Sequence, residues 1–511
     1  MEPSPPVGAE GHDQLMKNRF FDENVSRSLR ESWALGWPMI LIMFFQFLIG
    51  FTDVFVAGYL GTDVLAAVGY VGQLYWTLMI LANGLNVGTV SMVSQAYGAK
   101  SCEGVGIIGA NSLLVGMCVA GAITLLSQLF PDLIVKLAGM PPEIQTIAEN
   151  FLRIFSLVLI PTYVMILTSG VLRSSGRVRI AMVNSFAASS VNVAADFVLA
   201  FGYGPIPAMG YMGIAWATAL STTLGMCLNL LFVMRGAYAI SFGDIFRPLT
   251  PCLKNLLRLG IPTVLQQTSW NVGTLVVYYL VGNIRSGEIT ALAAMTAGVR
   301  VEAVIFLPIF ALNMAAAVLT GNRIGAGDIV GAQRGARVAA WLCLFIILVP
   351  SALIFVFAPE AASWLAHDQL VLEEMVRYLR INMLGTPFLA VGITLAGAIQ
   401  GAGDTYGSMK IIVTGMWLLR IPFILATIYV FGVGPSGVWW AMTCSMVLMC
   451  GLFIKRFSRG EWARASRDKT QNKLLWEACL PGEGAVEARR PRIEGTEREA
   501  RHCGGLPLGR K

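Results

Sequence analysis

Residues 33–58 read WALGWPMILIMFFQFLIGFTDVFVAG, a stretch in which Asp53 is the only charged residue. A helix needs roughly 20 predominantly apolar residues to cross the hydrocarbon core of a bilayer. This stretch is long enough, and apolar runs of similar length recur along the chain as far as Ile454. The pattern therefore predicts an all-α integral membrane protein.

The composition supports this fold class. Of the 511 residues, 56% are hydrophobic and 13% are charged, whereas about 25% of the residues of a soluble domain are charged. So few charged side chains cannot cover a surface that faces water on all sides. The net charge of +7 lies in short loops and tails and not on a basic helix with interleaved aromatics, so no nucleic-acid partner is expected.

The apolar runs predict about twelve spans in two sets of six, and the lipid bilayer is therefore the expected surrounding. The first set lies near residues 33–58, 64–92, 104–130, 144–172, 178–203 and 209–234. The second set lies near residues 256–283, 290–320, 332–358, 371–398, 408–431 and 435–455.

Lysine and arginine are concentrated in the loops on one side of these spans, including Lys100, Arg173, Arg177 and Lys410. Loops rich in these residues stay in the cytoplasm. We therefore expect a multi-pass membrane protein with both termini in the cytoplasm. Residues 1–32 are polar and show no cleavable signal peptide, so the first span is expected to direct insertion.

The chain contains an internal repeat. Tyr97-Gly98-Ala99 recurs as Ile324-Gly325-Ala326, where 325 − 98 = 227, and Leu152-Arg153-Ile154 recurs as Leu379-Arg380-Ile381 with the same offset. Six spans separate the copies, so both copies have the same orientation in the membrane. Parallel repeats of this kind build transporters. We expect two pseudo-symmetric six-helix bundles around a central cavity.

This organisation divides the chain into five predicted segments. They are a cytoplasmic N-terminal segment (1–32), an N-terminal bundle (33–234), a cytoplasmic linker (235–255), a C-terminal bundle (256–455) and a cytoplasmic tail (456–511). The tail is rich in Arg, Glu, Gly and Pro and has little apolar periodicity, so we expect it to be disordered.

Asp53 and Asp196 are carboxylates inside predicted spans, where a charge is costly and usually functional. Asn192 lies four residues before Asp196, on the same face of one helix, and Thr218 in the next span adds a hydroxyl. Two carboxylates in one dry pocket cannot both be ionised cheaply, so we expect the group to accept a proton near neutral pH. The same oxygens suit Na⁺, because hard cations favour oxygen donors. The alternative is that either acid caps a helix end or lies at the membrane surface.

Glu302 is a third acid within a span, two residues after Arg300. Residues two apart do not face each other on a helix, so spacing predicts no ion pair between them. Glu302 either faces the cavity, where it would attract organic cations, or pairs with another helix, for instance through Arg420. With Glu302 and Arg300, the side chains that we assign to the wall of a substrate cavity are Tyr75, Trp270 and Met314.

Motifs in both halves resemble one family of transporters. These motifs are GFTDVFVAG (50–58), QAYGA (95–99), VLRSSG (171–176), GAIQGAGD (397–404) and RIP (420–422). Each is short, but their order across about twelve spans resembles the multidrug and toxic compound extrusion (MATE) family, over roughly residues 27–455.

The resemblance implies a twelve-helix fold with a V-shaped cavity, in a monomer of the bacterial inner membrane. It implies export of amphipathic or cationic drugs and toxins in exchange for H⁺ or Na⁺, without a cofactor. Trp270 and Leu389 stand where the NorM-type branch has further acids, so the chain is identified as a prokaryotic member of the DinF-like branch. The family's cation site corresponds to Asp53, Asn192, Asp196 and Thr218.

The sequence also bears on two other functions. A flippase for a lipid-linked precursor would need several cationic residues along the cavity, and Arg300 and Arg420 are the obvious candidates. An intramembrane enzyme would need a cluster of catalytic or metal-ligating residues at membrane depth, which the sequence lacks. No G-x-x-x-x-G-K-[ST] motif occurs, so ATP-driven pumping by this chain alone is not expected. The nine cysteines form no C-x-x-C pair and are interpreted as small buried hydrophobes.

Overall fold

The computed structural model describes residues 9–137, 139, 142–235, 240, 249–284, 288–366, 368–466, 474 and 476–480. This part of the chain is helical and contains no β-strand, and Tyr203 and Ile206 form an isolated bridge. The predicted all-α membrane class is confirmed, because eleven of its helices are long and apolar enough to cross a bilayer. A twelfth long helix, α9, is more polar near its start, at Lys254 and Arg258.

The helices follow the predicted order. Those of the first half are α1 (Ala9–Leu60), α2 (Thr62–Gly98), α3 (Cys102–Leu129), α4 (Pro131–Leu137), α5 (Pro142–Ser174), α6 (Val178–Phe201) and α7 (Tyr211–Val233). Those of the second half are α9 (Leu249–Val281), α10 (Glu288–Gly325), α11 (Ile329–Val356), α12 (Ala358–Ser363), α13 (Gln369–Gly401), α14 (Thr405–Val413), α15 (Ile421–Leu425), α16 (Gly434–Ser458) and α17 (Glu461–Ala465). The π-helical segments Thr414–Arg420 and Ala426–Val430 make α14 and α15 parts of one span.

Several helices extend beyond the predicted spans. α1 begins at Ala9 and not near residue 33, and α2 and α10 end at Gly98 and Gly325. A helix satisfies its own backbone hydrogen bonds, so it can continue in water after the apolar stretch that hydropathy detects has ended. Most of the predicted linker and tail lies outside the described residues. Within the tail, α17 and the turn Glu477–Cys479 are elements that the sequence does not predict.

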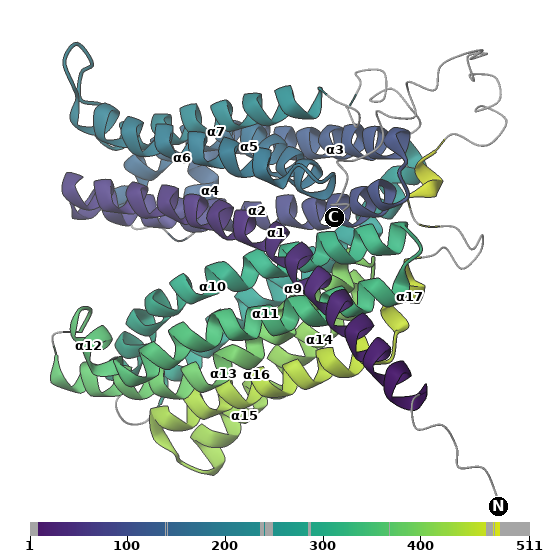
Figure 1. Ribbon diagram of the computed structural model, residues 1–511. Coiled ribbons are helices and arrows are strands. Elements are labelled where there is room, and N and C mark those ends of the chain that lie inside the picture. The colour runs from purple at the N-terminus through teal and green to yellow at the C-terminus, as the bar shows by residue number, and fades with distance from the viewer. Residues whose placement is uncertain are drawn as a thin grey trace, which may run out of the picture.

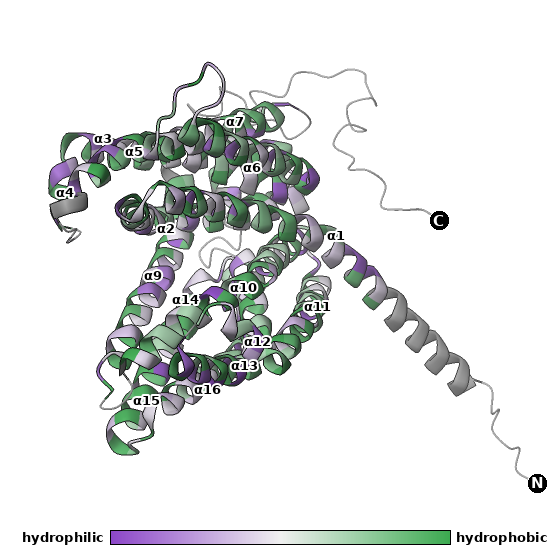
Figure 2. Cartoon of the chain, turned by 90° about the vertical axis from the view of Figure 1, so that its left-hand side faces the viewer, coloured by the Kyte–Doolittle hydropathy of each residue, from purple (hydrophilic) through white to green (hydrophobic). Residues whose placement is uncertain are grey.

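The helices form two groups, which correspond to the two halves of the repeat (Figure 1). In the first group α5 packs on α2, α3 and α7, and in the second α13 packs on α10, α11 and α16. α1 contacts both groups, because Glu31 and Met39 lie on α10 whereas Phe45 packs against Phe186 of α6. Figure 2 shows hydrophobic residues along the helices of both groups, as contact with lipid requires.

The two groups meet where repeat-related segments of α2 and α10 cross. A Cβ on Gly98 would overlap the carbonyl oxygen of Asn322, and a Cβ on Gly325 would overlap that of Gln95. The two contacts are related by the repeat, because 322 − 95 and 325 − 98 both equal 227. Gln95 Nε2 also donates to the carbonyl of Gly401 at 3.1 Å. We call this contact the α2–α10 crossing and the end of the molecule where it lies the α17 end.

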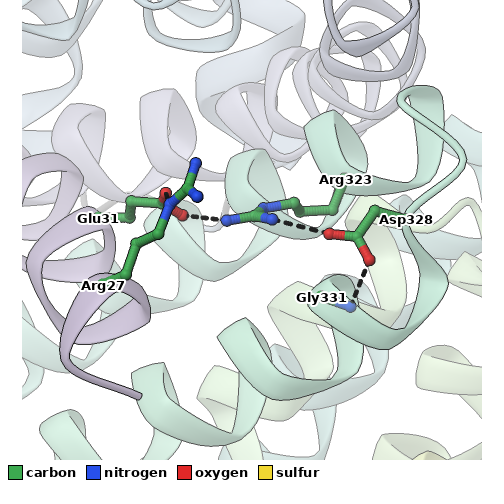
Figure 3. Close-up of polar contacts among 5 residues, drawn as sticks. All are labelled: Arg27, Glu31, Arg323, Asp328 and Gly331. Carbon is green, nitrogen blue, oxygen red and sulfur yellow. Dashed lines mark hydrogen bonds and ion pairs between the residues drawn. The ribbon is translucent and has the colours of Figure 1, made fainter. Parts of the chain in front are cut away.

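An ion-pair network joins α1, α10 and α11 at the same end (Figure 3). Arg323, near the end of α10, pairs with Glu31 of α1 and donates to Asp328 at 2.7 Å. Asp328 also accepts the Gly331 amide at 2.7 Å and so caps the start of α11. Arg27 pairs with Glu31 at 3.0 Å. The network therefore connects the first half of α1 to the second group of helices.

Candidate cation site and central cavity

Asp53, Asn192, Asp196 and Thr218 come together inside the first bundle, from α1, α6 and α7. The Thr218 hydroxyl donates to Oδ1 of Asp53 at 3.5 Å and accepts from Nδ2 of Asn192 at 3.5 Å. The carboxylates of Asp53 and Asp196 lie close enough to interact directly. The i,i+4 spacing of α6 does bring its two residues to the face that meets α1 and α7.

The cluster is dry and has unpaired oxygens. Asn192 and Asp196 are fully buried and Thr218 is nearly so, whereas Asp53 is half-buried. Within the described part of the chain, Oδ1 of Asn192 and both Asp196 oxygens have no hydrogen-bond partner. A buried oxygen without a partner is costly, so these atoms are suited to a proton or to a hard cation such as Na⁺.

Tyr75 lies beside this cluster and not at the centre of the molecule. Its hydroxyl donates to Thr162 of α5 at 2.9 Å, and its ring packs edge-on against Phe155 at 5.3 Å. Asp53 is near enough to act on it electrostatically. The side chain expected at the substrate cavity is thus inside the first bundle.

A small cavity of about 40 Å³ lies between the two bundles, lined by α2, α5, α10 and α13. Its lining includes the repeat-related pairs Asn86 with Asn313 and Arg173 with Gln400, since 313 − 86 and 400 − 173 both equal 227. The cavity therefore lies on the axis that relates the two halves. Met314, which the sequence assigns to a substrate cavity, is part of this lining.

Arg173 is a cavity residue that the sequence reasoning assigned only to a cytoplasmic loop. It is 4% exposed, and its Nη1 lies 3.6 Å from the sulfur of Met314. It stands in the last turn of α5, where the helix dipole favours a cation. The available signal was its repeat counterpart Gln400, a polar residue at the same point of the other half.

Glu302 is buried inside the second bundle and does not line the central cavity. Tyr378 and Asn382 lie beside it, and Arg420 is the cation that acts on it electrostatically. Arg420 lies over the Trp270 ring at 5.0 Å and donates to a serine of α16. This arrangement favours the interpretation that Glu302 interacts with Arg420 of another helix over the interpretation that it attracts organic cations to the cavity.

The other two residues of the expected cavity wall do not line the cavity. Arg300 is exposed, so it makes no wall with Glu302, and Trp270 contacts Arg420 inside the second bundle.

Known proteins resemble this chain over most of its length. A probable multidrug resistance protein NorM of Thermotoga maritima is 25% identical over 454 residues, which cover 88% of this chain and 96% of that protein. A protein of the same name from Bradyrhizobium diazoefficiens is 27% identical and covers 86% of this chain and 94% of its own length. Because these relatives carry the NorM name, they do not support the expected DinF-like branch.

Solved structures share the fold. A MOP superfamily transporter from Pyrococcus furiosus superposes with a TM-score of 0.78 at 24% identity, over 86% of this chain and 97% of that one. A Vibrio cholerae MATE transporter gives a TM-score of 0.79 at 18% identity, over 89% and 100% of the two chains. The MatE family model matches residues 38–198 and 262–425. That match covers more than half of the sequence, and the chain therefore belongs to the MatE family of multidrug and toxic compound extrusion transporters.

Proposed function

We propose that this chain is a secondary active antiporter that exports amphipathic or cationic small molecules, among them drugs and toxic organic compounds, in exchange for H⁺ or Na⁺. The observation that carries the proposal is the buried cluster of Asp53, Asn192, Asp196 and Thr218. Relatives named multidrug resistance proteins support the class of substrate.

In the proposed mechanism, the cluster exchanges a small cation with the water outside the membrane. Asp53 and Asp196 repel each other when both are ionised, and a proton or Na⁺ between them removes this cost. Asp53 is on α1, which also contacts α10 and α11 of the other bundle. A repacking of α1 around the occupied cluster would therefore change how the bundles meet. Export follows if the drug binds more weakly to the state that holds the cation.

We infer that the α17 end faces the cytoplasm and that the protein is a monomer in the bacterial inner membrane. Lysine and arginine are concentrated at this end, among them Lys100 and Arg177 in loops and Lys410 in α14. Since the bundles are in contact there, the arrangement described above is closed towards the cytoplasm. Both termini would lie on the cytoplasmic side.

We also propose that coupling is confined to the first bundle. Trp270 and Leu389 cannot ionise, and Leu389 is buried. Glu302 lies inside the second bundle beside Arg420 and Tyr378 and does not line the central cavity. H⁺ and Na⁺ both remain candidate ions for the single cluster.

The flippase alternative is supported by Arg173 alone. Among the residues that line the cavity, Arg173 carries a positive charge. Arg300 and Arg420 are not part of the lining, since Arg300 is exposed and Arg420 is buried in the second bundle. An anionic lipid headgroup would need more positive charge than one guanidinium at this position. Transport of a fluorescent lipid-linked precursor analogue that exceeds transport of ethidium would favour this alternative.

Ethidium efflux from proteoliposomes tests the proposal. A pH gradient and a Na⁺ gradient are imposed separately, and one of them should drive efflux. Asp53→Asn should abolish gradient-driven efflux, because the amide cannot exchange a proton and binds Na⁺ weakly. The matched control is Asp63→Asn, an exposed carboxylate at the start of α2, which should leave efflux unchanged. Full efflux by Asp53→Asn would exclude the cluster as the coupling site.

A further inference from the structure

The repeat gives the molecule two equivalent interfaces at the α17 end. At the first, α1 lies against α10 and α11, and at the second the start of α9 lies against α2 and α3. Asp328 caps α11 through the Gly331 amide, and its counterpart Ser101 caps α3 through the Gly104 amide at 3.1 Å, where 328 − 101 and 331 − 104 both equal 227. At the first interface, the capping residue also binds Arg323, which reaches α1.

A C-terminal segment occupies the corresponding place at the second interface. Its turn, Glu477–Cys479, is the short yellow element beside the start of α3 in Figure 1. Trp476 lies on Gly104, where an added Cβ would be 3.0 Å from Cε3 and Cζ3 of the indole. Glycine at the start of α3 therefore leaves room for the ring, and Trp476 is 6% exposed.

Cys479 extends this contact to α9. Its thiol lies within hydrogen-bonding distance of Cys252, near the start of α9, and both cysteines are buried. They belong to one hydrophobic cluster with Trp476, Val105 of α3 and Leu256 of α9. The segment thus contacts α3 of the first bundle and α9 of the second at the same time.

We propose that residues 476–480 form a C-terminal clamp, which binds across α3 and α9 and stabilises the closed arrangement of the α17 end. It does at the second interface what the Glu31–Arg323 pair does at the first. Burying an indole removes about 150–250 Å² from water. Separation of α3 from α9 would expose this area again, so the bound clamp opposes that separation. The inference depends on the proposed function only in requiring that the bundles separate at this end during transport.

Alkylation of the native cysteines by N-ethylmaleimide, followed by mass spectrometry of each cysteine, tests whether the clamp is bound. The hydrogen bond with Cys252 and burial both raise the pKa of Cys479, so little reactive thiolate forms. We expect Cys479 in the native full-length protein to react at least tenfold more slowly than in detergent-denatured protein. Trp476→Ala should remove most of this protection. Equal native and denatured rates in the unaltered protein would overturn the proposal.

A distance measurement tests whether the clamp stabilises closure. Spin labels are placed through unnatural amino acids at Arg179 and Tyr406, exposed and repeat-related positions on the two bundles at this end, where 406 − 179 = 227. Trp476→Ala should increase the population with the longer distance severalfold. The matched control is Trp364→Ala, because Trp364 is 84% exposed outside the clamp. An unchanged distance distribution in Trp476→Ala, with Cys479 now reactive, would refute a role in closure. Neither readout requires transport, so failure of the antiport proposal would be seen separately.

Discussion

Replacement of Gly98 by alanine should weaken the closed arrangement of the α17 end. The added Cβ would overlap the carbonyl oxygen of Asn322 and lie 2.7 Å from its carbonyl carbon, whereas ordinary contacts begin at 3.4 Å. The obstacle is backbone, which cannot rotate away, so α2 and α10 must separate by about 0.7 Å or more at this contact. Overpacking of this kind typically costs about 1–3 kcal/mol. That cost would lower the ratio of closed to open molecules roughly fivefold to 150-fold.

The assay is the distance distribution between spin labels at Arg179 and Tyr406. Gly98→Ala should increase the long-distance population, because α2 and α10 no longer touch at this point when the α17 end is open. Gly451→Ala is the matched control, since a Cβ on this helical glycine of α16 would meet nothing within 4 Å. The reasoning is refuted if Gly98→Ala matches the unaltered protein, or if Gly451→Ala shifts the distribution equally.

Three further changes test the network and the cation cluster. Glu31→Gln removes the charge that Arg323 binds across the first interface, so the ratio of closed to open molecules should fall about tenfold, as for the loss of a hydrogen bond between charged groups. An unchanged distance distribution would show that the pair is not coupled to closure. Burial raises the pKa of Asp328, but the Gly331 amide and Arg323 outweigh burial and lower it below its ordinary value. The stability that this carboxylate adds should therefore be complete above a pH of about 3.9 and lost as the pH falls through the lower pKa of the folded protein. Thermal unfolding measured at a series of pH values, for the unaltered protein and for Asp328→Asn, tests this. The prediction is contradicted if the unaltered protein loses no more stability at low pH than Asp328→Asn does. Thr218→Val keeps the side-chain volume but removes the hydroxyl, so half-maximal efflux should require severalfold more coupling ion; an unaltered ion dependence would remove Thr218 from the site.

The sequence was sufficient for features of the structure that follow from a single local rule. Hydropathy located the spans, because lipid admits only helices that satisfy their own backbone groups. The offset of 227 predicted two equivalent halves, and the reciprocal contacts of Gly98 and Gly325 follow that offset. The grouping of Asp53, Asn192, Asp196 and Thr218 was also predictable, because Asn192 and Asp196 share a helix face and acids are rare in spans.

The sequence was insufficient where packing between distant segments determines the position of a side chain. Nothing local shows that Arg173 turns into the central cavity, because arginine at the end of a span usually indicates a cytoplasmic loop. Glu302 and Arg420 come near each other although Arg420 stands in a π-helical segment more than a hundred residues later. The docking of Trp476 depends on room above Gly104 in a distant helix, and the low apolar content of the tail gave no sign of it.

The affinity for drug as a function of cation concentration tests the central claim most directly. If a cation at Asp53 and Asp196 weakens drug binding, the Kd for ethidium in the purified protein should fall up to tenfold for each pH unit of increase, when one proton competes. If Na⁺ is the coupling ion, the same change should follow each tenfold removal of Na⁺. Asp53→Asn should make the Kd independent of both ions. A Kd that varies equally with pH or Na⁺ in Asp53→Asn and in the unaltered protein would contradict the claim.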